Sequence, residues 1–309
     1  MTRPARGTRA AHAPGDARAV GQVVLAALGF SLISIFTIIA TRRGTPLTML
    51  LAARYVVAAV ALLPALGWLT RHPMSHGRLW PLFLVGAIGQ ATVAILSLSA
   101  LAFIPAATLV FLFYTFPAWV TLISAARGLE RLDRRKLVAL GVSLAGLGLL
   151  VGLPGAASIH PTGVVLALSA SVAYAIYIPV MGHLQRDVDA SFTTLLVATG
   201  CAAIFLAASL VRGEFSLALD KTSWGAIVAV GLFCTAAAFR LFLSGLAVLG
   251  PVRTSIVCTV EPLFAAVLAA VILDQPITPP VVAGGALILA AVVGLQLGSA
   301  PGPATGSRR

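Results

Sequence analysis

Few side chains in the long apolar runs of this chain could do chemistry. Glu261, followed by Pro262, is the only acid near the middle of such a run, and Arg240 and Arg54 are the two cations inside runs. A charged group in hydrocarbon costs roughly 2.5–3.5 kcal/mol on insertion scales, unless it is paired, hydrated or bound to a ligand. These residues therefore predict charge recognition or proton binding.

Arg240 lies about four residues from the centre of its apolar run, a distance of about 6 Å at 1.5 Å per residue. An ion pair between Arg240 and Glu261 is therefore one expectation, either as a charge pair that a substrate opens or as a permanent link between helices. Arg54 either snorkels to the membrane surface or faces a central cavity. Pro262, and Pro117 at the matching place of the first half, predict bent helices.

Neutral polar and aromatic residues in neighbouring runs are further candidates for contact with a substrate. Gln90, Tyr114 and Thr115 offer hydrogen bonds, and Tyr174 offers a ring for stacking. Trp119 is expected to form a hydrophobic wall. Each of these residues also fits a plain packing role.

Residues for covalent or metal chemistry are missing from the sequence pattern. It contains no phosphate-binding glycine loop and no nucleophile beside a histidine. The three cysteines all lie in apolar segments without paired spacing, which predicts neither a disulfide nor a metal site. His183, Asp187 and Asp189 are too few to support a membrane-embedded lipid-modifying enzyme. We therefore expect no enzyme activity and no cofactor.

The composition excludes a water-soluble protein. Charged residues make up 10% of the chain, hydrophobic residues make up 59%, and the mean hydropathy is +1.02, whereas soluble domains carry about 25% charged residues. Apolar runs of about 20 residues predict transmembrane helices in a lipid bilayer. The net charge of +12 resides mostly in loops and termini, where it is expected to set topology instead of binding nucleic acid.

The apolar runs predict an all-α integral membrane protein with ten transmembrane helices. The expected spans are 20–41, 47–69, 79–101, 105–126, 136–153, 162–181, 191–211, 224–246, 252–273 and 280–298.

The chain also nearly repeats itself. Residues 100–117 align with residues 245–262 without a gap, at an offset of 145. The aligned copies differ in charge, because the basic segment 131–136 corresponds to the uncharged segment 276–281. Five helices in each copy would turn the second copy over in the bilayer, as in transporters with inverted repeats. The predicted division is a cytoplasmic tail at 1–19, repeats at 20–155 and 156–299, and a second tail at 300–309.

The distribution of basic residues predicts the orientation. With the N-terminus inside, fifteen Lys and Arg residues fall on the inner side and four on the outer side, which by the positive-inside rule places both termini in the cytoplasm. The outer four are Arg42, Arg43, Arg212 and Lys221. No cleaved signal peptide is expected, because the first apolar run is too long for one.

Small residues recur four positions apart in the last helix of each half, at Gly148 and Gly152 and at Ala290 and Gly294. This spacing allows close helix contact. It serves either packing within the chain or a homodimer.

The chain resembles the drug/metabolite transporter superfamily, and within it the EamA-type exporters. The resemblance rests on ten spans in two halves, the Glu261-Pro262 pair, Arg54, and the Ala-Leu-Ala and Gly-Leu-Ala entries at 100–102 and 245–247. The chain departs in part from the Leu-Gly-Glu-like turn of the family, at 128–130 and at 273–275, and Arg240 is not typical.

The resemblance implies a secondary transporter of the inner membrane that exports small metabolites, amino acids or related amphipathic compounds, by alternating access. Energy would come from the substrate gradient or from protons, and Glu261 is the acid able to carry one. The alternative is a non-transporting receptor or scaffold with the same fold.

Overall fold

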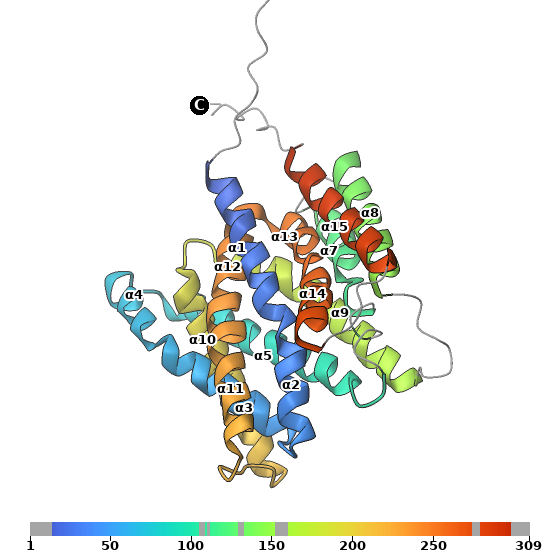
Figure 1. Cartoon of the computed structure of the whole chain (residues 1–309). Coiled ribbons are helices and arrows are strands. Elements are labelled where there is room, and N and C mark those ends of the chain that lie inside the picture. Colours follow the sequence, from blue (N-terminus) through green and yellow to red (C-terminus); the bar gives the residue numbers. More distant parts are fainter. Residues whose placement is uncertain are drawn as a thin grey trace, which may run out of the picture.

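A computed structural model describes residues 14–104, 109, 112–128, 133–151, 160–273 and 279–297. These residues form helices joined by short turns (Figure 1). The first half contains α1 Pro14–Ser31, α2 Ile33–Arg42, α3 Leu47–Ala61, η1 Leu63–Ala65, α4 Leu66–Arg71, α5 His76–Ala100, α7 Phe116–Ala126 and α8 Arg134–Val151. The second half contains α9 Pro161–Leu184, α10 Ala190–Val211, α11 Lys221–Ala229, η3 Val230–Ala237, α12 Ala238–Leu249, α13 Pro251–Cys258, α14 Glu261–Leu273 and α15 Pro279–Leu297.

Six helical segments of the described chain are long and apolar enough to cross a membrane. They are Asp16–Arg42, His76–Ala100, Pro161–Leu184, Ala190–Val211, Lys221–Leu249 and Pro251–Leu268. A seventh is obtained if α3 is counted together with η1 and α4, which bend by 51° at the turn that contains Pro64. The predicted count of ten is therefore not confirmed. The predicted spans 105–126, 136–153 and 280–298 stay predictions, since the first lies partly outside the described residues and α8 begins with three basic residues.

The two halves pack against each other in matching pairs. Helix α1 packs on α12, α3 on α10, α5 on α9 and α8 on α15. Each pair joins one half to the other. The pairs are symmetric: the contact of α1 with α12 corresponds to that of α9 with α5, and the contacts of α3 with α10 and of α8 with α15 each join equivalent helices. The first turn of α1 and the last turn of α15 lie at the same end of the bundle, and the connection from α2 to α3 lies at the far end (Figure 1).

Small residues allow several of these helices to approach closely. A Cβ atom at Gly29 of α1 would lie 2.6 Å from the Ala238 Cβ. A Cβ atom at Gly231 of η3 would lie 2.6 Å from Val57 Cγ1 and 2.9 Å from the backbone oxygen of Arg54. Distances below 3.0 Å leave no room for a side chain, so glycine is required for these contacts.

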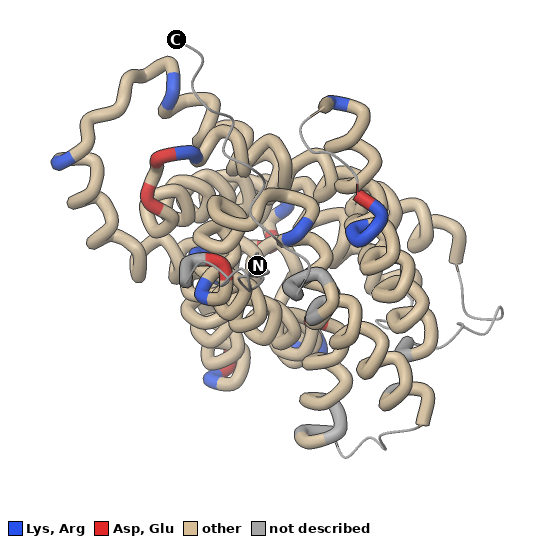
Figure 2. Tube along the Cα trace, turned by 90° about the horizontal axis from the view of Figure 1, so that it is seen from above, with Lys and Arg blue, Asp and Glu red and all other residues tan. Residues whose placement is uncertain are grey.

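Charged residues lie mainly at helix ends and in connecting turns, and few of them interrupt the helices (Figure 2). The three described cysteines are buried and unpaired. The few charges within the bundle are therefore the natural place to look for a functional site.

Candidate substrate site

Two helix breaks, at matching positions of the two halves, build the centre of the candidate site. A turn at Tyr114 and Thr115 precedes α7, and a turn at Thr259 and Val260 separates α13 from α14. The turns share their hydrogen bonding, since the Thr115 N–H donates to the Leu112 oxygen at 3.3 Å and the Val260 N–H to the Val257 oxygen at 3.2 Å. Each turn is followed by a proline near the first position of the next helix, Pro117 in α7 and Pro262 in α14.

Each proline thus follows a turn in the helical path, and the predicted bends at Pro117 and Pro262 stay predictions. A proline in the first turn of a helix loses no hydrogen bond, because its missing N–H would be unpaired there in any case. Transporters use such broken helices to hold polar groups near the middle of the membrane.

Glu261 is the first residue of α14 and is partly buried. The dipole of a helix N-terminus favours a negative charge at this position. The hydroxyl of Tyr114, itself 3% exposed, lies within hydrogen-bonding reach of the Glu261 carboxyl group. Tyr174 and Cys258 lie close enough to interact with its charge. The site therefore combines one acid with hydroxyl groups and a helix terminus.

Aromatic rings surround Tyr174 of α9 beside the site. The ring centroid of Tyr174 lies 4.9 Å from that of Phe116, 5.5 Å from that of Phe113 and 6.2 Å from that of Phe242. Thr115 contributes a hydroxyl 2.9 Å from the Ser171 Oγ of α9, and it also donates to the Leu112 oxygen at 2.7 Å. The structure thus brings together Glu261, Tyr114, Thr115 and Tyr174 from the sequence-based set.

Arg54 and Gln90 lie in a second group of residues. Arg54, in the middle of α3, is 3% exposed, and together with Gln90 of α5 it lines a small cavity of about 30 Å³. Its side chain faces this cavity, so of the two expectations for Arg54 the snorkelling one is wrong. Gln90 donates a hydrogen bond to the Tyr55 hydroxyl at 3.4 Å.

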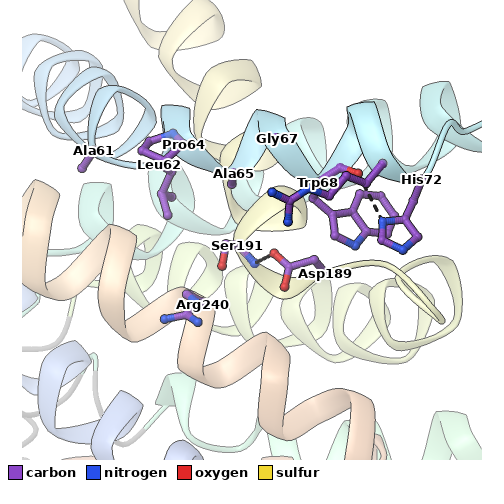
Figure 3. Close-up of a pocket in the computed structure, with 11 residues that line it drawn as sticks. Ala61, Leu62, Pro64, Ala65, Gly67, Trp68, His72, Asp189, Ser191 and Arg240 are labelled. Atoms are coloured by element: carbon purple, nitrogen blue, oxygen red, sulfur yellow. Dashed lines mark hydrogen bonds between the residues drawn. The ribbon is translucent and has the colours of Figure 1, made fainter.

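Arg240 does not meet Glu261. It is exposed on α12, lines a groove of about 480 Å³ with residues of η1, α4 and the start of α10, and forms no ion pair with any described residue. Figure 3 shows it across this groove from Trp68 and His72. The expected Arg240–Glu261 pair is therefore wrong, because α12 turns the guanidinium toward α10 and the bend of α4.

Trp119 is also separate from the site. It is 40% exposed on α7, and no described cavity includes it. Its side chain therefore lies on the surface of the bundle, where an indole ring contacts lipid. The expected wall of the site is formed instead by Phe116, Tyr174 and Phe242.

Two features of the site were not found from the sequence. Tyr55, 2% exposed beside Arg54, is the partner of both Arg54 and Gln90. The turn of π-helix η3 lies against α3 at the level of Arg54, and such turns are frequent at functional sites. Tyr55 could have been found from the sequence, because it stands directly beside Arg54 within an apolar run. The π-helix could not, because no sequence pattern marks one.

The far end of the bundle is closed by polar contacts between the halves. Arg43 Nη1 lies 2.9 Å from Asp220 Oδ2, and Glu214 accepts hydrogen bonds from Thr48 and from Arg212. Hydrogen bonding from Ser223, followed by the charge of Arg43, lowers the pKa of Asp220 to about 2. Hydrogen bonds from Thr48 and Arg212 lower the pKa of Glu214. Both carboxylates are therefore ionised at neutral pH.

The described helices and buried polar centre define a multi-pass membrane protein made of two similarly built halves. The chain belongs to the EamA-like transporter family, whose model matches residues 17–152 and again residues 161–297. It is thus a membrane transporter of the drug/metabolite type, as the sequence resemblance implied, and each match covers one half.

The fold is shared with known structures. One of them, described only as "Crystal structure of protein", has 22% sequence identity and a TM-score of 0.70, and the match covers 91% of this chain and 97% of that chain. No curated protein matches the chain.

Proposed function

We propose that this protein is a secondary transporter that exports small metabolites, namely amino acids or related amphipathic compounds, by alternating access. The pair of matched helix breaks at Tyr114-Thr115 and Thr259-Val260 carries the proposal. It places one acid, hydroxyl groups and a helix terminus inside the bundle, between the two halves. A permanently closed structural protein has no need of such an interruption in two helices.

Substrate contacts in this proposal come from Glu261, Tyr114, Thr115 and Tyr174. The carboxylate of Glu261 attracts a cationic group of the substrate or a proton, and the two hydroxyl groups supply hydrogen bonds. The Tyr174 ring stacks on apolar parts of the substrate. Arg240 and Trp119 are not included, because their side chains lie elsewhere.

In this proposal, the site becomes accessible from alternate sides of the membrane when the two halves move against each other. The contacts of Arg43 with Asp220 and of Thr48 with Glu214 close the far end. Movement of one half against the other would break these contacts and open the site there. With the orientation predicted from the basic residues, the far end is the periplasmic side, so that opening would release substrate from the cell.

Proteoliposomes loaded with a mixed metabolite panel test the proposal. We expect saturable efflux that is lost in Glu261→Gln, and acceleration of wild-type efflux by an imposed pH gradient if protons are coupled. The matched control is Asp187→Asn, which removes an acid whose side chain is 90% exposed at a residue with φ of 61°, a conformation that asparagine tolerates. Absence of efflux for every compound would favour the receptor or scaffold alternative.

A further inference from the structure

Arg54 is buried with most of its hydrogen-bonding capacity unused. Its Nη2 donates to the Tyr55 hydroxyl at 2.9 Å, whereas Nε and Nη1 have no hydrogen-bond partner. The guanidinium carbon lies 4.6 Å from the centre of the Tyr55 ring. Three N–H groups of a buried cation, one on Nε and two on Nη1, therefore point to no acceptor.

No acid among the described residues neutralises Arg54. The ion pairs of Arg43, Arg78, Arg212 and Arg253 lie at helix ends or in connections, and none of them involves Arg54. An arginine side chain stays protonated in proteins, so burial does not remove its charge. A buried charge without a partner is strongly unfavourable. The unpaired N–H groups of Arg54 are therefore available to an anionic group.

The cavity beside Arg54 has the size and lining for such a group. Its volume of about 30 Å³ exceeds the roughly 10–15 Å³ that one water molecule needs. Gln90 of α5, Thr194 of α10 and Thr235 of η3 line it together with Arg54 and Tyr55. The two threonine hydroxyls are already bonded to backbone oxygens of their own helices, at 2.6 Å and 2.9 Å. The guanidinium is thus the dominant free donor.

Irregular helices surround the same cavity. The break at Leu32 between α1 and α2 is flanked by Phe30 and Ile33, which both line it. The π-helix η3 contributes Cys234 and Thr235. Two departures from α-helical geometry therefore border this cavity, and π-helical turns are frequent at functional sites.

We propose that Arg54 binds the carboxylate of the transported compound, so that the substrates of this protein are carboxylates. A carboxylate only accepts hydrogen bonds and matches the planar guanidinium with two parallel bonds. The inference rests on the proposed function and adds a chemical class to it.

A row of packed aromatic rings connects the Arg54 cavity with the surroundings of Glu261. Phe239 lines the Arg54 cavity and stacks on Phe242, with ring centroids 6.0 Å apart, and Phe242 stacks in turn on Tyr174. Cys234, which lines the Arg54 cavity, lies close enough to interact with the charges of both Arg54 and Glu261. A compound with a carboxylate at one end and an apolar or cationic part at the other fits this arrangement.

Matched pairs of compounds test the proposal with purified wild-type protein. Benzoate and benzamide differ only in the carboxylate, as do each amino acid of the efflux panel and its amide. We expect benzoate, but not benzamide, to raise the midpoint of thermal unfolding in detergent. We also expect efflux of the carboxylates to exceed that of their amides by roughly tenfold or more, as hydrogen bonds to a charged group imply.

Variants then locate the effect. Arg54→Gln should abolish the preference for carboxylates. Arg54→Lys should retain part of it, since lysine keeps the charge but cannot form the two parallel hydrogen bonds of a guanidinium. The control Arg127→Gln makes the same change at an exposed residue at the end of α7 and should leave the preference intact.

The outcomes separate the two proposals. Equal efflux and equal stabilisation by carboxylates and amides would overturn the carboxylate assignment and leave the transporter proposal standing. Stabilisation by sodium chloride as strong as that by sodium benzoate would assign the site to an inorganic anion and equally overturn it. Lack of all efflux would instead overturn the proposed function, and the benzoate and benzamide comparison would still decide the chemistry of Arg54. That comparison needs no variant, so it holds if Arg54→Gln fails to fold.

Discussion

The hydroxyl of Tyr114 is the group that links Glu261 to the first half of the molecule. Since the tyrosine is buried and its ring packs on Phe116 with centroids 5.4 Å apart, the hydroxyl can be removed without disturbing the packing. At the residue scale, removal of this hydroxyl therefore tests the interaction with Glu261 without changing the shape of the site.

We therefore predict that Tyr114→Phe lowers the efflux rate by about tenfold, the size expected for one hydrogen bond to a charged group, and leaves the unfolding midpoint nearly unchanged. The matched control is Tyr177→Phe, because the buried Tyr177 hydroxyl has no hydrogen-bond partner. Its loss should be neutral or slightly stabilising. Equal loss of efflux in both variants would contradict the role of Tyr114.

At the scale of elements, the contact between η3 and α3 holds the Arg54 cavity in shape. Gly231 of η3 touches α3 so closely that an added Cβ would meet Val57 and the backbone oxygen of Arg54. At Gly225 of the neighbouring helix α11, an added Cβ atom would have no other atom within 4 Å. The two glycines therefore form a natural pair for one substitution.

We predict that Gly231→Ala destabilises the protein by about 1–3 kcal/mol through overpacking and reduces the preference for carboxylates. The change would be seen as a lower midpoint of thermal unfolding and in the efflux of matched acids and amides. Gly225→Ala should be neutral or stabilising, since alanine favours the helix. A destabilised Gly225→Ala with an unaffected Gly231→Ala would contradict the proposed contact.

At the scale of the whole molecule, the proposed inverted arrangement of the two halves makes a prediction about membrane sidedness. Arg127 at the end of α7 and Pro280 in the first turn of α15 occupy corresponding connections of the two halves and are exposed. We predict that cysteines placed at these two positions are labelled by a membrane-impermeant thiol reagent from opposite sides of the membrane. Labelling of both from one side would exclude inverted repeats and the ten-span topology together.

The closure of the far end should not respond to pH near neutrality. Because the pKa of Asp220 is lowered to about 2 from its ordinary 3.8, its contribution to stability is complete above pH 3.8 and is lost only as the pH falls through about 2. Glu214 is shifted in the same direction. We predict that the distance between spin labels at Arg42 and Lys221 stays constant from pH 8 to pH 5 without substrate.

The double variant Glu214→Gln with Asp220→Asn should lengthen that distance or broaden its distribution, since it removes both acids of the closure. A distance that lengthens between pH 8 and pH 5 in the unsubstituted protein would contradict the assigned ionisation. If transport varies with pH over this range, the change would then have to arise elsewhere, with Glu261 as the first candidate.

Much of the architecture could be predicted from the order of residues. Long apolar runs must form helices, because hydrocarbon cannot satisfy an open backbone, and the internal repeat shows that Pro117 and Pro262 occupy matching positions. The candidate role of Glu261 followed from its place as an acid near the middle of an apolar run. The number of membrane crossings could not be predicted in this way. Short or bent helices, such as α3 followed by α4, have ends that the apolar pattern does not define.

By itself, the sequence determined that this is a helical membrane protein of two similar halves, with one acid at a helix break and membership of a transporter family. Only the tertiary structure decided that Arg54 lies buried beside a small cavity, whereas Arg240 is exposed in a groove that does not include Glu261. The physical reason is that lipid and protein interior are equally apolar, so an apolar helix carries no pattern that tells its inward face from its outward one. Packing against neighbouring helices makes that choice.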